Sequence, residues 1–126
     1  LKELNIKNIK LPVSAPFHCS LMSPATEIMK NEIMKTNFLK PKNFIVSNVT
    51  AMANDEVDKI KNLLIHQIEK PVLWRESIIN MIKNGSNKFI EIGPGKVLSG
   101  LIKRIDRKVE TIQVNNIEDL KNLKNL

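Results

Sequence analysis

Residues 89–105, FIEIGPGKVLSGLIKRI, constrain the fold more than any other stretch of this sequence. The apolar run at 89–92 predicts a strand, the glycines on either side of Pro94 predict a turn, and the amphipathic run at 97–105 predicts a helix. A strand that passes through a tight turn into a helix is the building unit of α/β proteins. We therefore expect helices that cover a mainly parallel sheet.

The rest of the chain alternates in the same way. Strands are predicted at 11–14, 44–46, 89–92 and 109–114, and helices at 23–36, 55–70, 71–84, 97–105 and 117–126. The first helix has Ser23 as its N-cap and Pro24 at its first position. Its apolar stripe is expected to be Met22, Ala25, Met29 and Ile33. Pro71 is expected to end the second helix, because proline disrupts a helix interior. Gly85 is expected to follow the third helix, because glycine is common just after a helix end.

Length and composition bound the class of protein. The chain has 126 residues, the size of one domain, and begins with Leu1, so we expect it to be part of something longer. No apolar run reaches the about 20 residues of a membrane span, and no N-terminal leader is visible, so no membrane partner is predicted. A single cysteine, Cys19, cannot form an internal disulfide and favours a cytoplasmic location.

The net charge of +7 raises the possibility of a nucleic-acid partner. The 17 lysines and 3 arginines are, however, scattered along the chain, and there is no tyrosine to stack on bases. We expect a solvated basic surface and no nucleic-acid partner. A basic nucleic-acid-binding module remains an alternative function for the chain.

His18 is the first candidate for chemistry. It lies on a turn after the strand predicted at 11–14, and an imidazole can take and return a proton near neutral pH. An ordinary surface histidine is the alternative reading. Gln67 is the second candidate, because it falls on the apolar side of the second helix, where a buried amide needs a partner. A frayed last turn with the amide in water is the alternative interpretation. His66 is out of phase with that side and is expected to be exposed.

Two other patterns do not fit a binding site. Gly93, Pro94, Gly95 and Lys96 resemble a phosphate loop, but that motif needs glycine where Ile90 stands and Ser or Thr where Val97 stands, so a structural turn is expected. Two histidines and one cysteine lack the spacing of zinc ligands. The sequence therefore predicts no metal and no cofactor.

A general base needs a nucleophile, and this sequence has no G-x-S-x-G serine elbow. Either the nucleophile lies outside this chain, or the chain does not catalyse acyl transfer.

Four co-linear blocks carry a family resemblance: LPVSAPFHCSLM at 11–22, SNV at 47–49, HQIEKPVLW at 66–74 and FIEIGPGKVLSGLIKRI at 89–105. Together they resemble the C-terminal portion of the malonyl-CoA:acyl-carrier-protein transacylase family. The resemblance covers about residues 9–106. It implies a partial α/β-hydrolase-like acyltransferase core and transfer of malonyl from coenzyme A to acyl carrier protein in fatty acid biosynthesis.

The resemblance also implies residue roles. His18 matches the family's general base and acid, and Gln67 matches the residue whose main-chain carbonyl orients that histidine. Phe17 and Asn48 match positions near the substrate, and phenylalanine before the histidine goes with selection of malonyl over the larger methylmalonyl group. The implied partners are malonyl-CoA and acyl carrier protein.

The family's serine elbow and ferredoxin-like subdomain would lie upstream of Leu1. We therefore interpret residues 1–126 as the C-terminal segment of a single acyltransferase domain, inactive alone, whose further partner is the N-terminal part of the same enzyme. The apolar stripe of the second helix (Val57, Ile60 and Leu64) would be left uncovered, which predicts association. The alternative is a non-catalytic remnant of a split or decayed gene.

Overall fold

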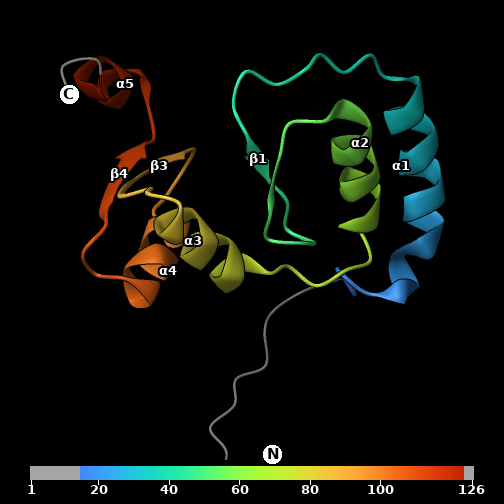
Figure 1. The fold of residues 1–126 in the computed structure, drawn as a ribbon, viewed down its shortest axis with the longest axis horizontal. Helices are drawn as coiled ribbons and strands as arrows, with labels where there is room; N and C mark the ends of the chain where they lie inside the picture. The colour runs from blue at the N-terminus through green and yellow to red at the C-terminus, as the bar shows by residue number, and fades with distance from the viewer. Residues whose placement is uncertain (1–14, 124–126) are drawn as a thin grey trace, which may run out of the picture.

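The structure, a computed structural model, describes residues 15–123 and forms two lobes. The N-terminal lobe contains η1 (Ser20–Met22), α1 (Ser23–Lys35), β1 (Ile45–Val46), β2 (Ala53–Asn54) and α2 (Val57–His66). The C-terminal lobe contains α3 (Trp74–Lys83), β3 (Lys88–Ile92), α4 (Val97–Ile105), β4 (Glu110–Val114) and α5 (Ile117–Leu123). Figure 1 shows the first lobe at the right and the second at the left. The strand predicted at 11–14 lies outside the described residues.

The five predicted helices are all present, with shifts at three of their starts and at one end. The second helix ends at His66, four residues before the predicted end at residue 70, so it stops before Pro71 is reached. The N-cap of α1 is Met22 and not Ser23, because the 3-10 turn of η1 leads directly into the helix. The second helix, α2, begins at Val57, two residues after the expected start at Asp55, with Glu56 as its N-cap. The third helix begins at Trp74 instead of residue 71. Residues 71–73 lie outside the helix, and the N–H of Leu73 donates to the carbonyl of Asn48 in the other lobe, at 2.9 Å.

The core of the C-terminal lobe lies between α3 and α4. Ile78 of α3 is 1% exposed and packs with Ile102 of α4 and with Val109. Partly buried neighbours complete this cluster: Trp74, Met81, Ile82, Phe89 and Ile105. The inward residues of α3 and α4 therefore follow the helical period.

Three burial predictions in the N-terminal lobe are wrong. The apolar stripe of α2, expected to be uncovered, is covered in part by α1: Ile60 is buried, and Val57 and Leu64 are half-buried. Met29, expected on the inner stripe of α1, is exposed, and Thr26 is buried beside Ile33 instead. The strand expected to be buried at 44–46 is a short β1 with Phe44 exposed before it. A run of apolar residues predicts a strand, but only neighbouring elements decide whether it is covered.

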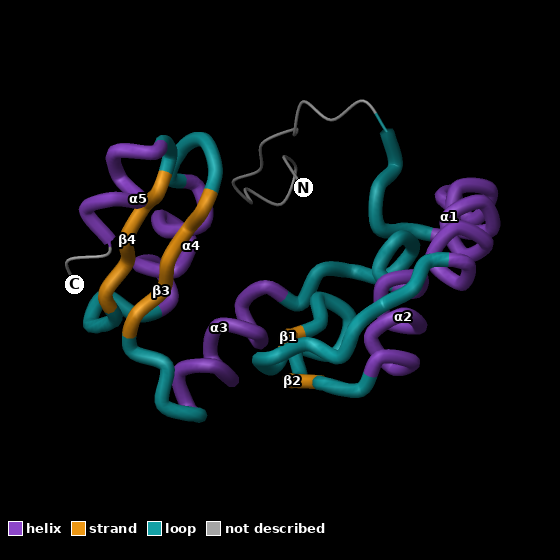
Figure 2. The backbone as a smooth tube through the Cα atoms, turned by 90° about the horizontal axis from the view of Figure 1, so that it is seen from above, coloured by secondary structure: helices purple, strands orange, loops and turns teal. Residues whose placement is uncertain are grey.

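The described strands form two sheets. β3 and β4 pair in parallel, with Ile90 opposite Ile112, and α4 makes the crossover between them. β1 pairs antiparallel with β2, a strand that the sequence pattern does not predict. Figure 2 shows β3 on the side of its sheet toward α3 and β4 on the side of α5. Strands and helices thus alternate as expected for an α/β chain.

Hydrogen bonds also fix how the lobes meet. Besides the Leu73 to Asn48 bond, Asn80 of α3 donates its Nδ2 to the carbonyl of Ala51 at 3.1 Å. Ala51 is buried and has a φ of +57°, a left-handed conformation that suits the tight turn between β1 and β2. Among the described helices, none is long and apolar enough to cross a membrane.

Candidate active site

His18 lies on a turn with an unusual backbone. Its φ is +60°, in the left-handed region, where histidine is found more often than most residues. The turn is closed by the Phe17 N–H, which donates to the carbonyl of Ala15 at 2.9 Å, and by the Cys19 thiol, which donates to the carbonyl of Pro16 at 3.1 Å. A left-handed residue of this kind costs about 1 kcal/mol or more and persists only where its surroundings hold it. The His18 side chain is accordingly aimed by the turn.

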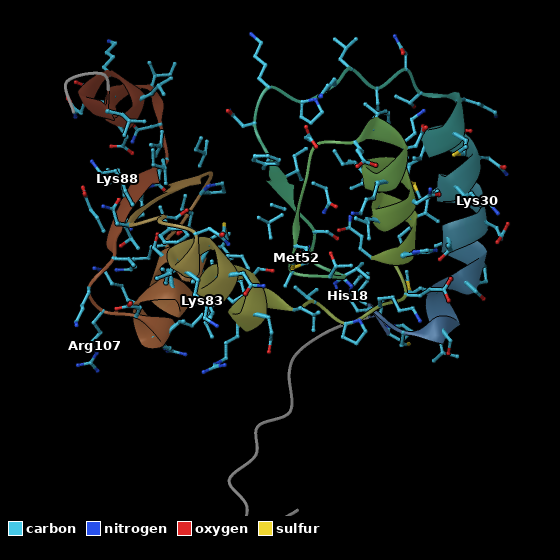
Figure 3. The ribbon with its side chains drawn as sticks, viewed as in Figure 1. His18, Lys30, Met52, Lys83, Lys88 and Arg107 are labelled. Atoms are coloured by element: carbon cyan, nitrogen blue, oxygen red, sulfur yellow. The ribbon has the colours of Figure 1, made fainter. Side chains whose placement is uncertain are left out.

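The ring of His18 is held by Gln67, 49 residues later in the chain. Nδ1 of His18 lies 2.9 Å from the main-chain oxygen of Gln67. Figure 3 shows His18 near the C-terminal end of α2. A carbonyl oxygen can only accept, so Nδ1 must be the donor and carry the hydrogen. In the neutral ring this leaves Nε2 unprotonated and able to accept a proton.

The local structure of α2 explains why the Gln67 carbonyl is available. The helix ends at His66, and Gln67 is its C-cap. The last carbonyls of a helix have no N–H partner within the helix. The turn that follows uses the carbonyls of Ile65 and His66, which accept from the N–H groups of residues 68–70. The carbonyl of Gln67 is therefore left for His18.

Asn48 contacts the other end of Gln67. The Asn48 Nδ2 donates to Oε1 of Gln67 in a long hydrogen bond of 3.5 Å, and the main-chain oxygen of Asn48 accepts from Leu73. Both side chains are half-buried. The structure thus brings three of the four predicted site residues, His18, Gln67 and Asn48, into one connected group.

A small cavity adjoins this group. It has a volume of about 90 Å³ and is lined by the polar residues Ser47, Asn48, Asn54 and Gln67 and by apolar residues of β1 and α2.

The fourth predicted residue, Phe17, is 58% exposed beside His18. The second histidine, His66, is exposed as expected. No cluster of three or more histidine, cysteine, aspartate or glutamate side chains that could hold a metal ion occurs among residues 15–123.

The glycine turn after β3 is structural, as predicted. Gly93 and Gly95 have φ of +136° and +101°, and the Gly95 N–H donates to Oδ1 of Asn115 at 2.7 Å. The N-terminus of α4 is occupied by the carboxylate of Glu91, which accepts from the N–H groups of Leu98 and Ser99 at 3.0 and 2.8 Å. A phosphate would have to displace this carboxylate.

Glu91 is a residue that the sequence reasoning missed. Hydrogen bonds from Ser99, first from its side chain and then from its backbone N–H, hold the pKa of Glu91 below its ordinary value. Desolvation raises this pKa in part, and the backbone N–H of Leu98 lowers it further. The sequence does carry a signal for this contact: Glu91 lies in a strand just before the start of a helix, and a carboxylate is stabilised near a helix N-terminus.

Comparison with known proteins gives consistent matches. No family model matches the chain. The malonyl CoA-acyl carrier protein transacylase of Bacillus subtilis is 45% identical over 113 residues, which are 89% of this chain and 35% of that protein. The crystal structure of malonyl CoA-acyl carrier protein transacylase from Clostridium perfringens has a TM-score of 0.88 and 44% identity, covering 98% of this chain and 39% of that one.

A third match is a solved complex of a type II PKS acyl-carrier protein with its malonyl-transacylase. It has a TM-score of 0.82 and 32% identity, and it covers 92% of this chain and 38% of the matched chain. The described fold is therefore that of part of an α/β acyltransferase core, as the sequence predicted. This chain spans well under half the length of the relatives that it matches.

Proposed function

We propose, from the premise that this chain corresponds to the C-terminal part of the malonyl-CoA:acyl-carrier-protein transacylases, that it supplies the general base of that reaction. The observation that carries the proposal is the 2.9 Å hydrogen bond from Nδ1 of His18 to the main-chain oxygen of Gln67. This bond leaves Nε2 of the neutral ring free to take a proton. The reaction is malonyl transfer from coenzyme A to acyl carrier protein in fatty acid biosynthesis.

The nucleophile in this proposal is a serine of the N-terminal part of the same enzyme, because the present sequence contains no serine elbow. Residues 1–126 are then the C-terminal segment of a single acyltransferase domain. The N-terminal part supplies the ferredoxin-like subdomain as well as the serine. The single cysteine is compatible with a cytoplasmic enzyme.

The first half-reaction transfers malonyl to the serine. The serine Oγ attacks the thioester carbonyl carbon while Nε2 of His18 takes the hydroxyl proton, and an ester bond to malonyl forms. The carbon–sulfur bond to coenzyme A breaks, and the departing sulfur receives the proton from His18. Coenzyme A leaves as the free thiol, and His18 is neutral again.

The second half-reaction uses the same proton positions in reverse. The phosphopantetheine thiol of acyl carrier protein gives its proton to Nε2 and its sulfur attacks the malonyl ester. The new thioester forms as the serine oxygen departs and recovers the proton. Gln67 keeps the ring oriented through both steps, in the role that a carboxylate has in other triads.

Two residues are assigned to the substrate side. The ring of Phe17 would occupy the space that the methyl group of methylmalonyl needs, which favours malonyl. Asn48 contacts the side chain of Gln67, the residue that orients the base.

The test is transfer of malonyl from malonyl-CoA to acyl carrier protein, measured with and without a supplied N-terminal part. The purified chain alone should be inactive, and adding the N-terminal part of the Bacillus subtilis relative should give activity that His18→Ala removes. Activity that survives His18→Ala would contradict the proposal. Lack of activity in a chimera that joins the two parts in one chain would favour the alternative, a non-catalytic remnant.

A further inference from the structure

Asn80 joins the two lobes through its side chain. It lies in the second half of α3, where Ile78 and Met81 pack into the core of the C-terminal lobe. The half-buried Asn80 donates its Nδ2 to the carbonyl of Ala51 in the N-terminal lobe at 3.1 Å, and the sulfur of Met52 lies 3.9 Å from the same nitrogen. Figure 3 shows Met52 on the side of the N-terminal lobe that faces α3. A polar side chain of a core helix therefore reaches across to the other lobe.

Ala51 has a conformation that alanine rarely adopts. Its φ is +57°, in the left-handed region, and the residue is 3% exposed. In this region the Cβ of an L-residue crowds the carbonyl that follows it, so a residue other than glycine stays there only where its surroundings hold it. Both backbone groups of Ala51 are held, because its N–H donates to the carbonyl of Ser47 at 2.8 Å and its carbonyl accepts from Asn80. The turn at residues 47–51 thus receives one of its hydrogen bonds from α3.

The same turn carries Asn48. The carbonyl of Asn48 accepts from the N–H of Leu73, the N-cap of α3, and its side chain donates to Oε1 of Gln67. The backbone at the start of α3 and the Asn80 side chain, about two helical turns later, therefore hold the turn at two points. Asn48 lies between this support and the residue that orients His18.

The contact between Asn48 and Gln67 is sensitive to the position of the turn. The hydrogen bond from Nδ2 to Oε1 is 3.5 Å long, which is already at the limit for such a bond. A small displacement of residues 47–51 away from α2 would break it. Whatever fixes the turn consequently decides whether Asn48 contacts Gln67.

We infer that Asn80 is a positioning residue of the candidate active site: its amide holds the left-handed turn at residues 47–51 and so keeps Asn48 against Gln67. It acts from the C-terminal lobe on contacts of the N-terminal lobe. Its role in catalysis rests on the proposed function, whereas the contacts themselves are those of this chain alone. The inference adds a residue to which the family resemblance assigns no role.

Four substitutions in the full chain test this role. Asn80→Ala removes the amide, and Asn80→Asp keeps the shape of the side chain while removing the N–H donor. Asn84→Ala is the matched control, because the Asn84 side chain is exposed and donates to the main-chain oxygen of Asn80 in the same region of the chain, at 2.7 Å. Ala51→Gly is the rescue variant, because glycine adopts a positive φ without the crowding of a Cβ. Circular dichroism checks that each variant keeps its fold.

The first measurement is hydrogen exchange at the N–H of residue 51, followed by NMR. Asn80→Ala and Asn80→Asp should each speed exchange at least fivefold, and Asn84→Ala less than twofold, because only the first two release the carbonyl of Ala51. When Ala51→Gly is present, Asn80→Ala should speed exchange less than twofold. The N–H of Ile60 in α2 should keep its rate in every variant, which separates a loosened turn from a lost fold. Equal rates at residue 51 in all variants overturn the inference.

The second measurement is the NMR signal of the Asn48 side-chain amide, which reports its hydrogen bond to Gln67. Asn80→Ala should move this signal most of the way to its position in Gln67→Ala, and Asn84→Ala should leave it in place. A role of Asn80 in stability alone would not move it. An unchanged signal in Asn80→Ala overturns the inference, since the turn would then hold Asn48 without Asn80.

Malonyl transfer by a chimera of this chain with the N-terminal part of the Bacillus subtilis relative separates the two proposals. Asn80→Ala should lower kcat at least threefold and change KM for malonyl-CoA less than twofold. The double variant with Asn48→Ala should have the kcat of Asn48→Ala alone, and losses that add would overturn the route through Asn48. An inactive chimera, with both NMR measurements as expected, would contradict the proposed function and support the positioning of Asn48 by Asn80.

Discussion

Nδ1 of His18 donates a hydrogen bond to the main-chain oxygen of Gln67 at 2.9 Å, although 49 residues separate them in the chain. The oxygen belongs to the C-cap of α2, and the turn that follows the helix uses other carbonyls. A group that every helix end leaves unpaired thus fixes the orientation of an imidazole on a distant turn.

The first prediction concerns which atom of Gln67 matters. Gln67→Ala keeps the main-chain oxygen, so it should leave the Nδ1-protonated form of His18 in place and lower malonyl transfer by the assembled enzyme less than about tenfold. His18→Ala should lower it by about a thousandfold or more, since removing one member of such a group costs several orders of magnitude. Nitrogen NMR of the imidazole in the isolated chain reads the tautomer. Equal losses in both variants would contradict the main-chain role.

The second prediction concerns Asn48. Asn48→Ala removes the long hydrogen bond to the Gln67 side chain and should lower the free energy of unfolding by about 0.5–1 kcal/mol. If the two amides act as a pair, Gln67→Ala should have nearly the same effect, and the double variant should cost no more than either one. Urea denaturation measures all three, with Asn62→Ala at an exposed position of α2 as the control. Fully additive losses would show that the pair does not interact.

The third prediction concerns the core of the C-terminal lobe. Ile78 is 1% exposed, so Ile78→Ala should cost about 2–5 kcal/mol of stability through lost burial and the cavity left behind. Ile28, 67% exposed on α1, provides the control: Ile28→Ala should change stability by less than about 0.5 kcal/mol. Comparable effects at the two positions would contradict the assigned core.

The fourth prediction is a pH dependence at Glu91. Because Ser99 and Leu98 hold the pKa of this carboxyl below its ordinary value of 4.5, the contribution of Glu91 to stability is fully present above that value. It is lost as the pH falls through the lowered pKa of the folded state. Glu91→Gln should therefore destabilise the chain at pH 7 and much less at pH 3, as measured by thermal unfolding at each pH. Glu27→Gln, an exposed position on α1, serves as the control and should show no such difference.

The fifth prediction tests the assignment of Phe17 to the substrate side. In the assembled enzyme, Phe17→Ser should raise transfer of methylmalonyl relative to malonyl by about tenfold or more, since one methyl group is worth about 1–3 kcal/mol of discrimination. Competition between the two thioesters gives the ratio directly. An unchanged ratio would mean that the exposed ring does not line the acyl site.

Some features of the site could be predicted from the sequence. His18 on a turn and Gln67 near a helix end can be recognised as local patterns in the sequence. The family resemblance implies that the main-chain carbonyl of Gln67 orients His18. The β1–β2 hairpin was not predictable in the same way, because a two-residue strand such as Ala53–Asn54 has no periodicity of its own. Glu91 was missed because a strand glutamate becomes a helix cap only when the chain turns back on itself.

The sequence by itself determined the order of the helices and, for α4, its ends at Val97 and Ile105. Helix periods, prolines and glycines act over a few residues, so their effects can be read along the chain. Only the tertiary structure decided that the carbonyl of Gln67 meets His18, and that Ile92 is exposed while Val114 is covered. Those outcomes depend on contacts between residues far apart in the chain, and local propensity carries no information about which distant surfaces pack together.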